Sequence, residues 1–195
     1  MKRIGESVDL LTGFPFPSAE YCDVGIRLLR GSNVKRGVTD WSNDLVQCWP
    51  RMTPEIARYE LSEGDLVIAM DGSLVGRSYA RLQAQDLPAV LLQRVARIRS
   101  GKLDIGYLSH FIGSDIFIGY CDSVKTVTAI PHISPSDIRN FTIPIPSDMS
   151  EQTAIASVLT EMDEELAVLA QRREKTRALK QAMMQELLTG RTRLV

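Results

Sequence analysis

The chain has 195 residues, of which 44% are hydrophobic and 24% are charged, and its formal net charge is −1. This length and composition predict one globular domain with an extension and exclude a wholly disordered chain. The balanced charge excludes a strongly basic protein, so any nucleic-acid footprint has to be local.

The three cysteines, Cys22, Cys48 and Cys121, lie far apart and form no CxxC pair. This odd, sparse set is not typical of a disulfide framework or a zinc site, and it fits a reducing compartment. The first six residues lack the apolar stretch of a signal peptide, and no apolar run approaches the roughly 18–20 residues that span a bilayer. We therefore expect a soluble cytoplasmic protein that does not contact a membrane.

In chain order, the first expected element is a short strand at residues 26–30, which ends at a glycine. A buried strand follows at residues 66–70. The Asp71-Gly72 pair that comes next is a strong hairpin signal, so we expect residues 74–81 to return as the partner strand. Residues 89–98 form another β-rich run after Pro88.

Helical signals follow the strands. Apolar residues recur at helical spacing from 105 to 120, with a break expected at Gly113. Ser134 followed by Pro135 is typical of a helix N-terminus, and the short helix should continue to Asn140.

The character of the chain changes at residue 146. All nine prolines and twelve of the thirteen glycines lie at or before this position, and residues 147–189 contain neither. The sequence thus predicts a mixed α+β domain at residues 1–146, followed by a helical segment at residues 147–195.

The second segment has the pattern of one long helix from about residue 150 to residue 189, with Gly190 as its C-cap. Steps of four and three residues define a coiled-coil seam in which seven of ten positions are apolar. The positions are Ile155, Leu159, Met162, Leu166, Leu169, Arg173, Thr176, Lys180, Met183 and Leu187. A helix of about 60 Å needs a partner along its length; packing against its own domain is the alternative.

The charges of this helix are segregated. Acidic residues gather in its first half at 161–165, and basic residues gather in its second half at 172–180. An antiparallel copy centred near residue 169 or 170 would lay one block against the other, whereas a parallel copy would oppose like charges. The pattern favours an antiparallel homodimer, although a charge run can also be a solvated face.

Signs of catalysis are sparse. The sequence has no glycine-rich cofactor loop of the methyltransferase kind, no P-loop and no GxSxG elbow. Asp65 and Asp71 bracket a strand but have no Glu-x-Lys partner of the nuclease kind, and turn aspartates are common. His110 lies inside an apolar helix, where a histidine is more often a core or surface residue than a ligand. His132 lies between prolines and has no acid or cysteine at ligand spacing. We therefore expect no catalytic residue, no metal ligand and no cofactor in this chain.

Polar and basic loops are the remaining candidates for function. Arginine and asparagine can bond base edges in the major groove, and lysine holds phosphates. Ordinary surface loops have the same composition, so this pattern alone leaves DNA binding open. The candidate DNA-binding residues are Asn33, Lys35, Arg36, Ser73, Arg77, Tyr79, Arg81, Lys125 and Thr126.

Several segments in this order resemble the specificity subunits of type I restriction–modification systems. The similar segments are the early strand and loop at 28–34, a Gly-Asp hairpin at 61–77, the Pro-Ile-Pro exit at 144–146, the Glu-Gln helix start at 151–156 and the helix end at 179–190. The resemblance implies an α+β target-recognition domain on a long conserved helix. Family members usually carry two of each, and this chain carries one.

The resemblance also implies a division of labour. This chain would recognise double-stranded DNA, a modification subunit would bring S-adenosylmethionine, and a restriction subunit would bring ATP, Mg and translocation. The seam positions Ile155 to Leu187 would hold either a second copy, a different half-subunit or the rest of a longer chain. The rival function is a coiled-coil adaptor whose first domain binds protein.

Overall fold

The computed structural model describes residues 1–193, so the last two residues of the predicted helical segment lie outside the described part. The chain forms two compact units, Met1–Thr153 and Ala154–Val195. The long helix begins at Met149, so its first turn belongs to the first unit.

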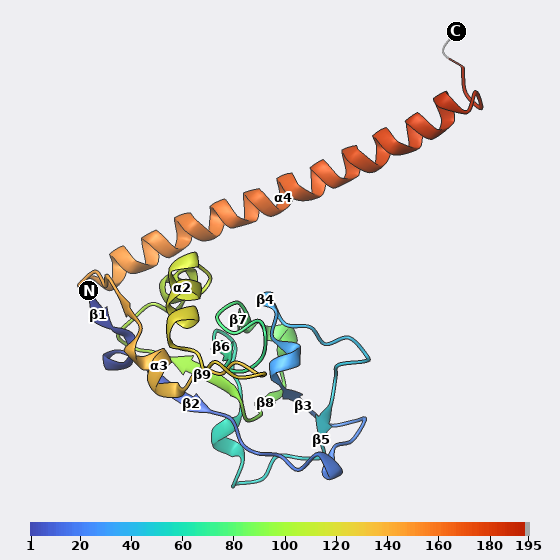
Figure 1. Cartoon of the computed structure of the whole chain (residues 1–195). Coiled ribbons are helices and arrows are strands. Elements are labelled where there is room, and N and C mark those ends of the chain that lie inside the picture. The colour runs from blue at the N-terminus through green and yellow to red at the C-terminus, as the bar shows by residue number, and fades with distance from the viewer. Residues whose placement is uncertain (194–195) are drawn as a thin grey trace. The chain divides into compact units, whose positions relative to one another are not determined.

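A five-stranded sheet forms the centre of the first unit, in the order β2, β9, β6, β7, β4 (Figure 1). All neighbours are antiparallel except β7 and β4. All four residues of β6 are buried, which explains its unbroken apolar sequence. The strands are β2 (Asp9–Thr12), β4 (Arg36–Gly37), β6 (Leu66–Ala69), β7 (Tyr79–Arg81) and β9 (Val95–Arg99).

Two smaller sheets complete the β-structure. In one of them β3 lies between antiparallel β5 and parallel β8, and in the other β1 pairs with β10. The strands are β1 (Lys2–Arg3), β3 (Ile26–Leu29), β5 (Cys48–Trp49), β8 (Ala89–Leu91) and β10 (Thr142–Ile143). A core of buried apolar side chains, Leu28, Leu91 and Val67 among them, joins the three-stranded sheet to the central one.

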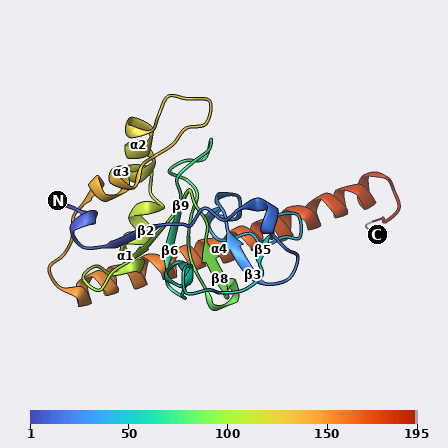
Figure 2. The ribbon, with the colours of Figure 1, turned by 90° about the horizontal axis from the view of Figure 1, so that it is seen from below.

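Three α-helices and the three-stranded sheet lie on opposite sides of the central sheet (Figure 2). The helices are α1 (Ile105–Ile112), α2 (Asp115–Val124) and α3 (Pro135–Asn140). Short 3-10 turns occur at Ile4–Glu6, Ser18–Glu20, Gly31–Asn33, Ala57–Tyr59 and Ala84–Asp86. Phe117 of α2 is fully buried and packs edge-on against Phe141, with ring centroids 4.9 Å apart, which fixes α2 to the segment after α3.

The predicted strands at 26–30 and 66–70, the helix break at Gly113 and the capped helix after Ser134 are confirmed. The predicted return strand at 74–81 is wrong in its start, because β7 begins only at Tyr79. The preceding residues instead form consecutive turns, in which the amide of Val75 donates to Gly72 (3.2 Å) and that of Arg77 to Leu74 (2.8 Å).

The run at 89–98 is two strands, because a turn with Arg94 at φ +67° separates β8 from β9.

The second unit is the rest of α4 (Met149–Leu188), a helix of 40 residues and therefore about 60 Å. The predicted long helix and its cap at Gly190 are confirmed. Gly190 has φ +72°, its amide donates to Leu187 and the next amide donates to Glu186, which is the pattern of a glycine C-cap.

The apolar seam positions from Leu159 to Leu169 are between 37% and 62% exposed in the single chain. Among the described residues, no helix is both long and apolar enough to cross a membrane.

Candidate nucleic-acid interface

Loops that are distant in the sequence meet at the β6–β7 connection. The first contact is the parallel pairing of β4 with β7, which aligns Arg36 with Tyr79. The amide of Tyr79 donates to the carbonyl of Lys35 at 2.9 Å. The basic loop at 35–37 therefore lies beside the return strand of the hairpin.

A second set of bonds joins the β6–β7 connection to the loop between α2 and α3 (Figure 2). Asp71 and His132 form an isolated antiparallel bridge, and the amide of Gly72 donates to Pro131 at 2.9 Å. Within the α2–α3 loop, the amide of Thr126 donates to the carbonyl of His132 at 3.0 Å. The two loops thus run side by side.

We call residues 33–38, 71–81 and 122–132 together the three-loop surface. These segments contain five lysines or arginines and two aspartates, a formal charge of +3 with histidine neutral. Since the whole chain has −1, the remaining residues sum to −1 − 3 = −4. The fold therefore gathers positive charge that the overall composition hides.

Asp122 pairs with two cations of this surface. Its carboxylate lies 2.5 Å from Nζ of Lys125 and 3.8 Å from Nη2 of Arg77. The hydrogen bond from Lys125 lowers the pKa of Asp122. The carboxylate therefore stays charged at neutral pH and holds both cations at the surface.

Asp71 makes a similar arrangement at the other end of the connection. Nη1 of Arg94 donates to one carboxylate oxygen at 2.6 Å, and Nδ1 of His132 contacts the other. Arg94 remains 67% exposed, whereas the side chain of Asp71 is 17% exposed. This carboxylate ties the α2–α3 loop to the β8–β9 turn and leaves a cation at the surface.

All nine predicted DNA-binding residues lie in the three segments that define this surface, and they differ in exposure. Arg36, Ser73 and Arg81 are exposed, and Lys35 is half-buried with its ammonium 3.8 Å from Asp40. Thr126, which is exposed, and Tyr79, which is half-buried, also make contacts within the protein. The hydroxyl of Thr126 accepts from the amide of His132 at 3.0 Å, so it fastens its own loop.

Tyr79 is half-buried, and its hydroxyl lies so close to Gly113 that a Cβ there would be 2.2 Å away. This ring packs against the α1–α2 junction.

Asn33 requires a correction. It is fully buried, its Oδ1 accepts from the amide of Arg30 at 3.1 Å and its Nδ2 donates to the carbonyl of Asp40 at 3.0 Å. Because both ends of the amide bond the backbone, this side chain shapes the loop and does not face a base. An asparagine in a loop after a strand gives the same local signal in both roles.

Sequence reasoning missed the contribution of Arg94 and His132. Neither has a local signal, because their common partner Asp71 is 23 and 61 residues away. It also missed three exposed apolar side chains at the loop tips, Leu74, Val127 and Ile130.

The two aspartates considered for catalysis lie at opposite ends of β6. Asp65 is 3% exposed and accepts a two-pronged contact from Arg99, with Nη2 at 2.7 Å from Oδ2. Six residue steps of extended chain place Asp65 and Asp71 about 20 Å apart, too far to share an ion. In the described part of the chain, no group of three or more His, Cys, Asp or Glu could hold a metal.

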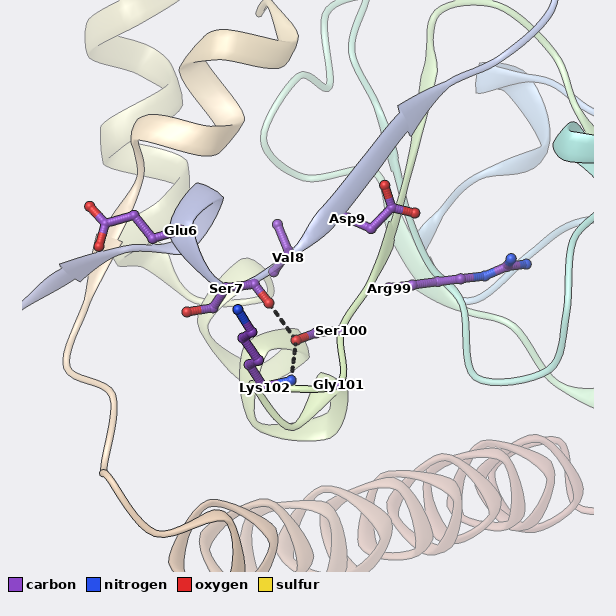
Figure 3. Close-up of a pocket in the computed structure, with 8 residues that line it drawn as sticks. All are labelled: Glu6, Ser7, Val8, Asp9, Arg99, Ser100, Gly101 and Lys102. Carbon is purple, nitrogen blue, oxygen red and sulfur yellow. Dashed lines mark hydrogen bonds between the residues drawn. The ribbon is translucent and has the colours of Figure 1, made fainter.

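A shallow hollow of about 670 Å³ lies between the first 3-10 turn and the segment after β9. Figure 3 shows the residues that line it. The hydroxyl of Ser100 donates to the carbonyl of Ser7 at 2.6 Å and accepts from the amide of Lys102 at 3.0 Å. Arg99 is held by Asp65. These side chains bond to the protein, so the hollow is a structural junction.

Sequence comparison identifies the family. A sequence model described as the type I restriction modification DNA specificity domain matches residues 51–176. The chain belongs to this family. The matched region contains the hairpin and the α2–α3 loop of the three-loop surface, together with the first 28 residues of α4.

Two curated relatives are specificity subunits of type I restriction enzymes. EcoAI of Escherichia coli is 34% identical over 164 residues, which cover 82% of this chain and 27% of that subunit. The specificity subunit of MjaVIII from Methanocaldococcus jannaschii is 28% identical over 202 residues, which cover 98% of this chain and 46% of that subunit. The chain thus spans less than half the length of either relative.

Solved structures share the fold. The HsdS subunit from Thermoanaerobacter tengcongensis superposes with a TM-score of 0.64 at 20% identity, over 95% of this chain and 43% of that one. The type I S subunit from M. genitalium gives 0.58 at 21% identity, over 95% and 44%. The predicted fold class, an α+β domain followed by one long helix, is confirmed.

Proposed function

We propose that this chain recognises a DNA sequence for a type I restriction–modification system, with the three-loop surface as its contact face. The observation that carries the proposal is the convergence of three distant loops with a combined charge of +3 in a chain of net charge −1. Family membership supports it, because the matching domain is named for DNA specificity.

In this proposal the chain performs no catalysis and holds no cofactor or metal. A modification subunit supplies S-adenosylmethionine and methylates the target, and a restriction–translocation subunit supplies ATP and Mg chemistry. The described residues fit this role, since Asp65 and Asp71 are used in structural ion pairs. DNA and the two enzyme subunits are thus the proposed partners.

Salt dependence of binding to duplex DNA tests this proposal. Contacts to several phosphates make the logarithm of the affinity fall linearly with the logarithm of the salt concentration, by about 0.9 per phosphate. Lys35→Ala should weaken binding to all DNA sequences alike and reduce the slope of log affinity against log salt concentration by about one. Arg81→Ala should cost on the order of 1–3 kcal/mol only on sequences in which Arg81 contacts a base.

Lys102→Ala is the matched control, because Lys102 lies outside the three-loop surface. Binding to protein partners without any binding to DNA would favour the adaptor function instead.

We also propose that two copies pair through α4 in antiparallel orientation. The exposed seam residues Leu166 and Leu169 lie near the centre of the helix, and an antiparallel pair would bring the acidic block of one copy to the basic block of the other. The basic block is partly paired within its own helix, since Glu174 lies 3.0 Å from Arg173 and 3.5 Å from Arg177. Exposed pairs of this kind contribute only about 0.3–0.5 kcal/mol. The apolar seam therefore supplies most of the association energy.

The seam has a matched test. Leu166→Glu together with Leu169→Glu should convert a dimer to a monomer in light scattering. Val168→Glu with Leu179→Glu places the same charges on exposed apolar positions outside the seam and should leave the dimer intact. A dimer in the first double variant, or a monomer in the second, would remove the seam from the proposal.

A two-fold protein recognises a two-fold site, so a homodimer predicts inverted half-sites around an unread spacer. Insertion of about seven residues in α4 keeps the seam and lengthens each helix by about 10 Å. The preferred spacer should then lengthen by a few base pairs in methylation mapping with the modification subunit. An asymmetric target would indicate pairing with a different half-subunit.

A further inference from the structure

Three large apolar side chains stand exposed at the tips of the two joined loops of the three-loop surface. Leu74 is 57% exposed, Ile130 is 62% exposed and Val127 is fully exposed. Leu74 is two residues from Gly72, and Ile130 is next to Pro131. The amide of Gly72 donates to the carbonyl of Pro131 at 2.9 Å. The apolar tips therefore belong to one paired structure.

The backbone beneath these tips is hydrogen-bonded. The carbonyl of Leu74 accepts from the amide of Arg77 at 2.8 Å, and the carbonyl of Ile130 accepts from the hydroxyl of Thr128 at 2.7 Å. The amide of Thr126, next to Val127, donates to His132 at 3.0 Å. Because these local bonds restrain the loops, the apolar side chains are presented to solvent by a defined backbone.

Turns of this kind ordinarily carry polar residues or glycine at their tips. Apolar side chains at such positions lose the free energy of burial, about 25 cal/mol for each Å² that remains in water. More than half of each of these three residues remains exposed in the single chain. A partner that removes them from water would recover that free energy.

The charges near the apolar tips and the small area of the tips favour DNA over a protein as the partner. Arg77 and Lys125 lie in the same two loops, and the exposed guanidinium of Arg94 is bonded to Asp71 at their base. A stable protein interface needs about 800 Å² of surface on each side, more than three loop-tip side chains supply. Apolar tips on loops that also carry cations match the major groove, where phosphates flank the base edges.

The major groove offers one apolar group, the C5 methyl of thymine, and it admits a two-stranded β-ribbon. Asp71 and His132 form one isolated antiparallel bridge between the joined loops, so the two loops lie side by side although they are not strands. We propose that Leu74, Val127 and Ile130 are specificity-determining residues that contact thymine methyl groups in the target. This inference rests on the proposed function, because it requires the three-loop surface to face DNA.

Replacement of thymine by uracil tests the inference, since it removes the methyl group and keeps every hydrogen-bonding edge. The probe is the duplex that the wild-type chain, with its modification subunit, selects from a randomised pool. Uracil at the contacted positions should weaken wild-type binding by about fourfold for each methyl group. Leu74→Ala, Val127→Ala and Ile130→Ala should each lower affinity for the thymine duplex and reduce this preference for thymine over uracil.

Val24→Ala is the matched control, because Val24 is 86% exposed in the first unit and lies outside the three-loop surface. It should retain the full preference for thymine.

Three outcomes would overturn the inference while leaving DNA recognition intact. Wild-type binding that is equal on thymine and uracil duplexes excludes methyl contacts. Alanine variants that lose the same affinity for both duplexes indicate that the apolar side chains insert between base pairs. Variants with normal DNA binding that no longer bind the modification subunit indicate a protein contact. Absence of salt-dependent DNA binding by the wild type would instead refute the proposed function itself.

Discussion

Substitution of Asp122 should strengthen DNA binding. Its carboxylate lies 2.5 Å from Lys125 and 3.8 Å from Arg77, and it occupies the cations that a phosphate would use. Because the hydrogen bond from Lys125 lowers its pKa, Asp122 is ionised under all ordinary binding conditions. Asp122→Asn removes the competing charge and keeps the shape of the side chain.

The size of the effect follows from the geometry. A phosphate bonded to the same nitrogens would approach to about 6 Å from the carboxylate, where repulsion of two unit charges in water amounts to about threefold in affinity. Release of Arg77 and Lys125 allows up to two additional phosphate contacts, each of which steepens the salt slope by about 0.9. The gain should therefore be largest at low salt and shrink as salt is added.

Fluorescence anisotropy with a labelled 30 bp duplex at several salt concentrations measures both quantities. Asp23→Asn is the matched control, since Asp23 is exposed in the same unit and outside the three-loop surface. It makes the same change in net charge. If Asp122→Asn binds DNA no more tightly than Asp23→Asn, Asp122 does not compete with DNA phosphates for these cations. The placement of the interface is then wrong.

Three further predictions concern the fold. Cys121 is fully buried, and burial raises the pKa of its thiol to about 12. At pH 8, iodoacetamide should therefore modify this thiol on the order of a thousandfold more slowly in the folded than in the unfolded chain. Equal modification rates, measured by mass spectrometry, would contradict this. Phe117→Ala should destabilise the first unit by about 3–5 kcal/mol in urea unfolding, and Phe117→Leu by less; equal losses would exclude the cavity as the cause. Gly190→Ala places a Cβ at φ +72° and should fray the last turn of α4, at a cost of about 1 kcal/mol, in hydrogen exchange; unchanged protection would show that the cap is dispensable.

Elements with local signals were predictable from the sequence. Ser134 caps α3 through its own hydroxyl, which accepts from Asp137 at 3.1 Å, and this pattern is visible within four residues. The break at Gly113 and the absence of glycine and proline from 147 to 189 are also local. Signals of this kind are sufficient because helix caps and helix continuity depend on neighbouring residues.

The start of β7 was not predictable in this way. Asp71-Gly72 predicts a tight hairpin, but Gly72 donates its amide to Pro131, 59 residues away, and the chain makes further turns before Tyr79. Local turn propensity cannot include this competing partner. For the same reason the sequence predicts a DNA-binding role for Asn33, although its side-chain amide bonds the backbone of Arg30 and Asp40.

Two aspartates explain why the net charge of the chain gives no sign of the basic three-loop surface. Asp71 and Asp122 count as negative charge, which argues against nucleic-acid binding, yet they hold the cations and loops of the three-loop surface in place. In the proposed function, each carboxylate bonds cations that a phosphate of DNA would otherwise bond. An acidic residue that organises a basic surface therefore lowers the net charge of the chain, while the surface keeps an excess of positive charge. The relevant quantity is the charge of the surface that the fold assembles, which is +3 here, and this sum depends on contacts between residues as far apart as Lys35 and Tyr79 or Asp71 and His132.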